Sequence, residues 1–541
     1  MPYSVAVRLA ESPAKPDSVA QKIVQCQGNT FVTCIRLVDG RVDKAWSTGR
    51  MMRDINMLLQ RKNDRQGRLC FAPKAHCLCN DGHTLAAIRA VENSADVVLP
   101  ESAILVRELI QDIRFIQTHL QHFYQFHLSD WVNLKAALRA DPVKTARMTS
   151  VWGENATHFR SVQDNLRPLA DKELKSVHSY GEYSGREELH LLLHGHAFSS
   201  VQAGFSLQKA LKLLGCTPKE FKAYHIGGLP ADLNLNAATV EELRAHLEEC
   251  RAFICKTFPS DLARLAKAYP HLVSLGKNTS FMAYANETTC KLKISKDQTA
   301  PWELSRYENP VVREECEPQW NDMDRRNYRL SAKQDRPLFS WNAPRSFWLP
   351  APRHKNLACE VGPLARVLCD LSAEQSVMQQ TFLRVSCDCG ISIKDMTSMM
   401  GRVLSRGIES SALMDSICSS VDKLESLVTT ENRHHVDFSL PAEGTGIGRV
   451  DVPRGILTHT VHWDRKQITK HEYLIPSLWN FSPRDSRGEP GPLEHALMGT
   501  PVSNPEYPVE ILRTLHELDP CNTCYVLIED HNTGLTTVTA A

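Results

Sequence analysis

Asp-Pro-Cys-Asn-Thr-Cys, residues 519–524, lies near the C-terminus of this 541-residue chain. Two thiols three residues apart can bind one metal ion from a single turn of backbone, because a thiolate is a soft ligand for Ni, Fe or Zn. A redox pair or two buried structural thiols give the same pattern, so one C-x-x-C is weak evidence. A second cluster, His76-Cys77-Leu78-Cys79 followed by His83, lies far upstream. If the two clusters meet, most of the chain must fold as one interlocked unit.

The composition is that of an ordinary soluble chain. Lys plus Arg total 63 and Asp plus Glu total 62, so the net charge of +1 indicates neither nucleic acid nor a membrane surface as a partner. The sequence has no run of about 18 or more apolar residues, so we expect no membrane span. The N-terminus lacks an export signal, and the 17 cysteines favour reduced thiols and metal ligands over a disulfide framework. We therefore expect a cytoplasmic protein, with co-export or membrane association through a partner left open.

Local patterns predict a mainly helical chain with peripheral strands. Residues 29–46 alternate apolar and polar side chains around an Asp-Gly turn, which predicts a β-hairpin. Apolar residues recur every three or four positions after Pro100, which predicts a long helix. We expect the histidines on or just after this helix, His119, His122 and His127, to be structural. Further helices are expected at 84–97, 200–215, 238–256 with Thr239 as N-cap, 362–373, 395–407 and 409–429, and short strands at 457–475.

Eight ordered motifs give the chain a recognisable family resemblance. They are AWSTGRMMRDI (45–55), HTLAAIRAVE (83–92), HLQHFYQFHLSDWV (119–132), EVGPLARVL (360–368), VPRGILTH (452–459), IPSLWNFSPRD (475–485), GPLEHALMGTPV (491–502) and EILRTLHELDPCNTC (510–524). On these motifs the chain resembles the large subunit of NiFe hydrogenases, most of all the uptake-type branch, over nearly its full length.

The resemblance implies a fold, a cofactor and a partner. It implies a mainly α fold with peripheral β (α+β), a central bundle of long helices, and one interlocked domain over residues 1–541. In the family, nickel takes four buried thiolates, and two of them bridge to an iron that also holds CO and two cyanides. Hydrogen is split heterolytically there, and electrons leave through a small subunit that carries Fe–S clusters. Whether such heterodimers assemble further is left open.

The resemblance also assigns metal ligands by motif position. Cys79 and Cys524 match the two thiolates that bridge nickel and iron, and Cys521 matches a terminal nickel thiolate. His83 matches a histidine that donates a hydrogen bond to a bridging sulfur, a contact that tunes the metal. A structural histidine at the start of a helix is the plain alternative for His83.

Four further residues match the wall above the metals. Arg454 matches the arginine that donates to a cyanide and polarises bound hydrogen, as a fixed guanidinium can. Asp519 matches the carboxylate that pairs with this arginine, and Pro453 shapes the same wall. Ser477 matches the hydroxyl that donates to the other cyanide.

The chain departs from the family pattern at the nickel shell and at the C-terminus. His76 stands where the family has the first cysteine of the upstream C-x-x-C, so one thiolate is replaced by imidazole or lost; Cys77 offers a thiolate one residue away. Gln27 replaces a proton-passing glutamate and cannot titrate. Leu527 replaces the histidine after which the family's tail is cleaved, so residues 525–541 are expected to stay and the family's Mg site is expected to be lost.

Three functions are compatible with these observations. The first is a divergent hydrogenase-type catalytic subunit with a Ni–Fe or Fe centre. The second is a non-catalytic subunit that serves as a structural partner, a sensor or an assembly scaffold with a degenerate metal site. The third is a redox enzyme that uses a mononuclear Fe or a Zn in the same cavity; three thiolates and a histidine suit zinc well. The sequence leaves open whether nickel is loaded.

Overall fold

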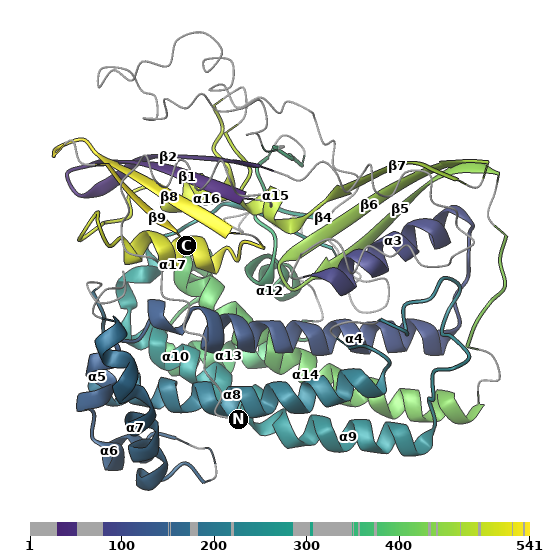
Figure 1. Ribbon diagram of the computed structural model, residues 1–541, viewed down its shortest axis with the longest axis horizontal. Helices are drawn as coiled ribbons and strands as arrows, with labels where there is room; N and C mark the ends of the chain where they lie inside the picture. The colour runs from purple at the N-terminus through teal and green to yellow at the C-terminus, as the bar shows by residue number, and fades with distance from the viewer. Residues whose placement is uncertain are drawn as a thin grey trace.

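The computed structural model shows a helical body with sheets along one side (Figure 1). Structural statements below refer to the residues it describes, which are 30–50, 79–149, 151, 153–173, 182–217, 221–284, 303–306, 349, 351–354, 357–372, 376–430, 434–439, 442–465, 467–484, 488–521, 523–533 and 536–540.

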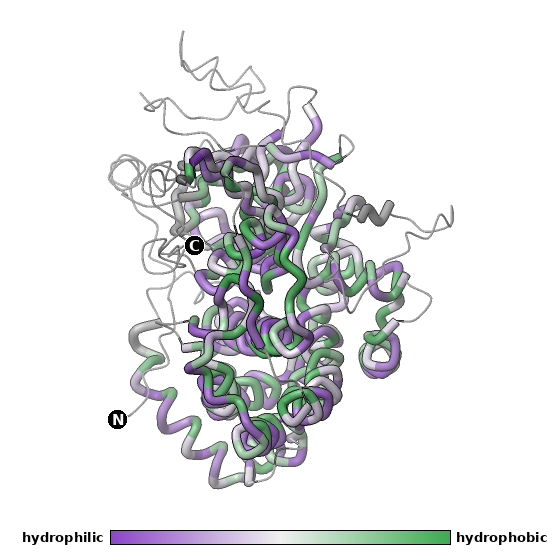
Figure 2. The backbone as a smooth tube through the Cα atoms, turned by 90° about the vertical axis from the view of Figure 1, so that its right-hand side faces the viewer, coloured by the Kyte–Doolittle hydropathy of each residue, from purple (hydrophilic) through white to green (hydrophobic). Residues whose placement is uncertain are grey.

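The body is a bundle of long helices, as expected. Helices α4, α8, α9 and α14 run side by side along the long axis in Figure 1. The members of the bundle are α4 (Glu101–Leu120), α8 (Glu187–Leu213), α9 (Ala237–Ala252), α10 (Phe258–Ala268), α13 (Gln379–Cys389) and α14 (Met399–Thr430). Figure 2 shows apolar and polar segments interleaved along these helices, which is typical of helices packed around a shared core.

Shorter helices flank the bundle. Helices α5 (Leu134–Arg139), α6 (Pro142–Ala146) and α7 (Ala156–Glu173) gather at one end, where α5 and α7 pack with α8. Helices α3 (Asn80–Ser94), α12 (Pro363–Leu371), α15 (Pro476–Asn480), α16 (Pro492–Leu497) and α17 (Val509–Glu517) lie between the bundle and the sheets. Single turns of other helix types are η2 (Gln121–Phe126), η3 (Leu128–Asp130), η5 (Phe253–Thr257), η6 (Pro270–Val273) and η7 (Ile393–Asp395).

Three sheets are present in the described residues. The first has the order β2-β1-β8-β9, from β1 (Thr30–Val38), β2 (Arg41–Arg50), β8 (Thr523–Asp530) and β9 (Thr536–Ala540). The second has the order β5-β6-β7, from β5 (Glu443–Val452), β6 (Gly455–Asp464) and β7 (Gln467–Leu474). The third pairs β3 (Ser280–Ala283) with β4 (Glu303–Arg306).

The first sheet joins the two ends of the described chain. Strands β1 and β2 form the predicted hairpin, and Asp39 and Gly40 at its turn both have positive φ, as the tight turn requires. Strand β8 then pairs in parallel with β1, with Thr30 opposite Thr523 and Leu37 opposite Asp530. This pairing brings the downstream cysteine motif beside the N-terminal hairpin.

Two predictions about the helices were wrong. Residues 395–407 and 409–429 do not form two helices, because most of them belong to the single helix α14. Thr239 is not an N-cap; Asn236 caps α9, and its side chain accepts a hydrogen bond from the backbone N–H of Thr239 at 3.0 Å. The elements not predicted include the helices α5, α6, α7, α10, α13, α15, α16 and α17 and the strands β5, β8 and β9. The helix expected at 84–97 is confirmed as α3, although it begins four residues earlier.

Two glycines let α3 lie directly on the second sheet. A Cβ atom at Gly446 would come 1.8 Å from the carbonyl oxygen of Ala90, and one at Gly448 would come 1.8 Å from that of Ala86. No side chain fits at either place, so strand β5 contacts the backbone of the helix. Cys79 and His83 lie at the start of this helix, which is therefore positioned by the glycines.

Gly448→Ala is expected to destabilise the protein by about 1–3 kcal/mol, because the added methyl group must push α3 away from β5. Thermal unfolding followed by circular dichroism measures the change. Gly204→Ala in α8 is the matched control: nothing lies within 4 Å of its Cβ position. That change should stabilise the helix by about 0.5–1 kcal/mol. Equal melting temperatures for the two variants would contradict the close approach.

Candidate metal centre

The predicted site residues come from five places in the fold. Cys79 immediately precedes α3, and Arg454 lies in the tight turn between β5 and β6. Ser477 lies in the short helix α15. Cys521 follows α17, and Cys524 lies in β8. All three cysteines are buried, are free of disulfides and belong to the main apolar core.

Arg454 links the upstream and downstream motifs. Its Nη1 donates to Sγ of Cys79 at 3.5 Å, and its Nε forms an ion pair with Oδ1 of Asp519 at 2.9 Å. Burial alone would lower the pKa of Arg454, but Asp519, Cys79 and Cys521 outweigh burial and raise it. A permanently charged guanidinium thus lies against Cys79 and close to Cys521. The neighbouring Pro453 contributes its carbonyl oxygen, which accepts from Nη2 of Arg366 at 2.9 Å and holds the turn in place.

Ser477 and strand β1 contact the segment that carries the downstream cysteines. The backbone N–H of Cys521 donates to Oγ of Ser477 at 3.1 Å. A hydroxyl that accepts this bond keeps its own proton for donation, so Ser477 can still act as a donor. Cys524 is fully buried opposite Phe31 of β1, and burial raises the pKa of its thiol.

Asp519 has an unusual backbone conformation, and a second arginine contacts its carboxylate. Its φ is +52°, in the left-handed region that non-glycine residues seldom adopt. Nη1 of Arg406 lies 3.5 Å from its Oδ2, and Nε of Arg406 lies 3.4 Å from Oε2 of Glu517. Burial alone would raise the pKa of Asp519, but Arg454 and Arg406 lower it below its ordinary value. The carboxylate is therefore ionised and locked between two guanidinium groups.

A small cavity lies beside this ion pair. It has room for about one water molecule. Its lining residues are Glu360, Val361, Pro363, Leu364, Arg402, Arg454, Asn480, Glu517, Leu518 and Asp519. Two of the charged groups neutralise each other, because Arg402 donates to both carboxylate oxygens of Glu360 at 2.7–2.8 Å. All of the lining residues are buried, which shields the cavity from bulk water.

His83 is buried on the same face of α3 as Cys79, which lies four residues earlier. Its backbone N–H donates to the carbonyl oxygen of Cys79 at 3.0 Å, and its ring Nδ1 lies 2.8 Å from Nε2 of His459. Burial, with a smaller contribution from His471, lowers the pKa of His83 to about 3. The ring is therefore neutral. Its predicted hydrogen bond to a metal-bound sulfur stays a prediction.

Several departures from the family pattern fall outside the described residues, namely His76, Cys77 and Gln27. The fourth ligand of a metal at Cys79, Cys521 and Cys524 is therefore not placed. Leu527 is described, and it lies in the middle of β8 opposite Cys34. Residues 528–530 continue the same strand, and residues 536–540 form β9 beside it.

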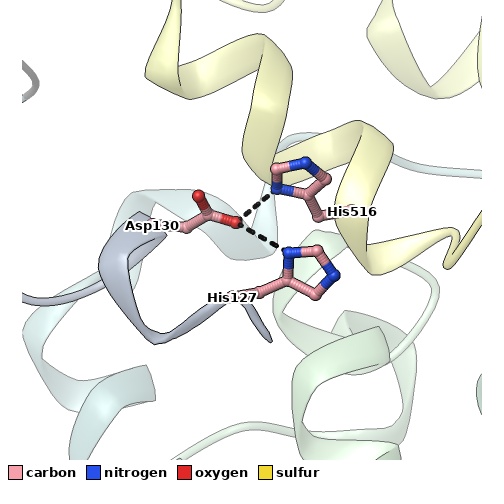
Figure 3. A group of neighbouring side chains, drawn as sticks. All are labelled: His127, Asp130 and His516. Carbon is pink, nitrogen blue, oxygen red and sulfur yellow. Dashed lines mark hydrogen bonds and ion pairs between the residues drawn. The ribbon is translucent and has the colours of Figure 1, made fainter. Parts of the chain in front are cut away.

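A histidine–aspartate–histidine cluster anchors the loop that carries Asp519 (Figure 3). Nδ1 of His516 lies 2.6 Å from Oδ2 of Asp130, and Nδ1 of His127 lies 3.8 Å from the same oxygen. The two imidazole rings stack with their centroids 4.1 Å apart. The carbonyl oxygen of His516 accepts from Nε2 of His122 and from the backbone N–H of Asp519. His122 thus helps to hold this loop through its bond to His516. The ligand atoms of His127, Asp130 and His516 all lie within 4.8 Å of one another, a spacing at which they could also hold a metal ion, so the structural role of His127 stays a prediction.

The donor set fits a soft metal ion. Cys79 accepts a hydrogen bond from Arg454, the backbone N–H of Cys521 donates to Ser477, and Cys524 is buried in β8; none of the three thiols forms a disulfide. A thiol as deeply buried as Cys524 stays protonated on its own, whereas a bound metal deprotonates it and supplies the missing positive charge. Thiolates select soft or borderline metals such as nickel, iron and zinc.

A family model described as nickel-dependent hydrogenase matches residues 53–527 of the chain. The chain belongs to the nickel-dependent hydrogenase family. Its hydrogenase relatives include the Hydrogenase-2 large chain of Escherichia coli, which is 24% identical over 94% of this chain and 96% of that relative. Another is the uptake hydrogenase large subunit of Afipia carboxidovorans, which is 28% identical over 90% of this chain and 91% of that relative.

Solved hydrogenase structures share the fold. The Ni-Fe-Se hydrogenase from Desulfovibrio vulgaris Hildenborough superposes with a TM-score of 0.65, at 19% identity, over 91% of this chain and 98% of that one. The enzyme from Desulfomicrobium baculatum gives a TM-score of 0.62 at 21% identity, over 90% of this chain and 95% of that one. The predicted fold class is therefore confirmed. Among the described residues of this family member, no helix has the length and apolar character to cross a membrane.

Proposed function

We propose that the chain is a divergent hydrogen-activating large subunit, which oxidises or produces H2, or carries out a related two-electron reaction. The family uses a Ni–Fe active site, and its large subunits pair with Fe–S small subunits. The observation that best supports the proposal is Arg454, a buried cation that donates to Cys79 and is held by Asp519. We propose that Cys79, Cys521 and Cys524 hold the metals, and that His76 or Cys77 completes the set.

A Ni–Fe centre bound there would supply the metal site for heterolytic cleavage of hydrogen. Arg454 presents its forked donors to the pocket, where its charge favours the polarisation of hydrogen and the binding of anionic ligands. Asp519 keeps the fork in place and stays ionised. Ser477 offers its hydroxyl proton to the pocket, and the close packing around the small cavity excludes bulk water.

Elemental analysis and infrared spectroscopy of the purified protein test this proposal together. We expect nickel and iron, with infrared bands of metal-bound CO and cyanide. Cys524→Ala should remove at least about nine-tenths of the metal, because it deletes a buried thiolate ligand. Cys250→Ala, at an equally buried cysteine in α9, should keep the metal. Folded wild-type protein with neither nickel nor iron would overturn the proposal, and zinc alone would support a closed Zn site.

A non-catalytic role is the second candidate, and the C-terminal strands favour it. Leu527 stands inside β8, and the residues beyond it are hydrogen-bonded within a sheet. If the residues after Leu527 are kept in the mature protein, the subunit either matures by another route than its relatives or carries an idle site. Hydrogen-dependent dye reduction by the complex with its Fe–S small subunit distinguishes a catalytic subunit from a non-catalytic one.

We propose a cytoplasmic location, which fractionation of the source cells tests.

A further inference from the structure

Two histidines and one aspartate from distant parts of the chain lie as close together as the ligands of one metal ion (Figure 3). One ligand atom from each of His127, Asp130 and His516 lies within 4.8 Å of the other two. Oδ2 of Asp130 is 2.6 Å from Nδ1 of His516 and 3.8 Å from Nδ1 of His127. Two ligands of one ion lie at most about 4.2 Å apart, which is twice a bond of about 2.1 Å. Small shifts of these side chains would therefore place all three on a single ion.

The backbone around the three side chains is held in place by other contacts. His127 precedes the η3 turn and Asp130 ends it, and the N–H of Asp130 donates to the carbonyl oxygen of His127 at 3.1 Å. Side chains three residues apart in such a turn lie on the same side. Helix α17 adds Arg513 and His516, which both contact Asp130; Nε of Arg513 donates to its carbonyl oxygen at 2.6 Å. The group is therefore preorganised on three elements of the fold.

The two imidazole rings present their nitrogens to the same point. They stack with their centroids 4.1 Å apart, and Figure 3 shows both Nδ1 atoms turned toward Asp130. Burial lowers the pKa of His127 well below its ordinary value, so this ring is neutral and has a lone pair to offer. The side chains of Asp130 and His516 are 2% and 9% exposed, whereas that of His127 is 19% exposed. An ion can therefore enter from the side of His127.

A third histidine, His122, offers an acceptor next to this group. Its Nε2 lies 2.9 Å from the carbonyl oxygen of His516, and a carbonyl only accepts, so Nε2 carries a proton. Burial lowers the pKa of His122 well below its ordinary value, so its Nδ1 holds a lone pair. Among the described residues, none donates to this buried nitrogen. The ring centroid of His122 lies 4.5 Å from that of His127. A water molecule on a metal ion is a donor that would satisfy it.

We propose that His127, Asp130 and His516 bind one zinc ion, with a water molecule as the fourth ligand that donates to Nδ1 of the third histidine. Two imidazoles, one carboxylate and a water are a common tetrahedral zinc set. Zinc has no geometric preference from its d electrons, so it tolerates the unequal spacing of these ligands. Magnesium and calcium prefer sets made of oxygen alone.

This second metal site is separate from the cysteine pocket but stabilises the segment that leads to it. The carbonyl oxygen of His516 accepts from the N–H of Asp519 at 2.8 Å. An ion bound to the ring of His516 would therefore fix the turn that presents Asp519 to Arg454. The site needs no thiolate, so it stands whether or not nickel is loaded.

Zinc binding by the purified full-length chain tests the proposal, with zinc chloride as the added metal. We expect one zinc ion per chain whose X-ray absorption shows nitrogen and oxygen at about 2.0–2.2 Å, without sulfur at about 2.3 Å. His127→Phe keeps an aromatic ring on His516 but removes a ligand. Asp130→Asn can still accept from Nδ1 of His516 but removes the charge. Each variant should retain less than about a tenth of this zinc.

His462→Phe is the matched control for these two variants. Nε2 of His462 also lies beside a carboxylate, 3.6 Å from Oε2 of Glu472. Within the part of the chain that the structure describes, these two residues belong to no group of three metal ligands. The control should keep its zinc. Added zinc should raise the melting temperature of the wild type and of His462→Phe, and leave that of His127→Phe unchanged.

Each other result would contradict the histidine site. A wild-type chain that binds no zinc, or binds it only through sulfur, would overturn it. Equal zinc contents in the wild type, His127→Phe and Asp130→Asn would overturn it as well, and so would an equal loss in His462→Phe. Melting temperatures without added metal show that each variant is folded. Nickel, iron and the infrared bands report separately on the cysteine pocket, so a failure there would leave this site intact.

Discussion

Arg454→Lys is expected to lower hydrogen-dependent dye reduction by roughly 10²–10³-fold, the usual cost of removing a preorganised donor from a closed active site. Lysine keeps the positive charge next to Asp519, so the buried carboxylate retains a partner. It lacks the planar fork that lets one group bind Asp519 through Nε and Cys79 through Nη1 at the same time. Arg454→Ala is a weaker test, because breaking a buried ion pair costs about 3–5 kcal/mol in stability.

The assay compares rates per bound metal for the complex with its Fe–S small subunit. Arg107→Lys is the matched control: Arg107 is also a buried arginine, and it binds both carboxylate oxygens of Glu92 at 2.9 Å. It contacts no residue assigned to the metal pocket. We expect the control to keep its rate per metal. A fully loaded Arg454→Lys protein with the wild-type rate would show that the guanidinium has no part in turnover.

The sequence predicted those elements whose formation depends mainly on residues close together in the chain. The hairpin was predictable because Asp39-Gly40 suits the turn whatever the rest of the chain does. The unity of α14 was not predictable, because Gly407 looks like a helix breaker. In the fold, a Cβ atom there would come 3.1 Å from Cα of Pro259, so the glycine serves the packing of α14 on α10. Periodicity alone does not reveal that contact.

Some contacts of the candidate site were predictable from the sequence, and others were not. Motif positions predicted that Asp519 would pair with Arg454, and the two side chains do meet. The second partner of Asp519, Arg406, belongs to no quoted motif and arrives from α14, 113 residues away. The contact between His83 and His459 depends on how α3 lies across the sheet. A single sequence carries little information about such contacts.

A chain that ends after Leu527 is expected to lose most of its stability, in contrast to family members that are normally cleaved at that position. Truncation would remove Ile528, which is 1% exposed and worth about 1.5–3 kcal/mol in burial. It would also remove β9 and its ladder to Tyr525–Glu529, together with the bond from Thr537 Oγ1 to the carbonyl of Pro505. Each bond contributes about 0.5–1.5 kcal/mol.

These losses together approach the net stability of a typical protein, about 5–15 kcal/mol. They also fall beside the proposed centre, because without β9 the strand that contains Cys524 becomes the edge of its sheet. We therefore expect the truncated chain to melt at a much lower temperature and to retain little metal. Asn532→Ala is the control, since it deletes only an exposed bond to Asp39 at the hairpin tip and should change stability by less than about 0.5 kcal/mol. Wild-type melting and metal content in the truncated chain would show instead that β9 is dispensable. Cleavage after Leu527 would then be compatible with a mature subunit.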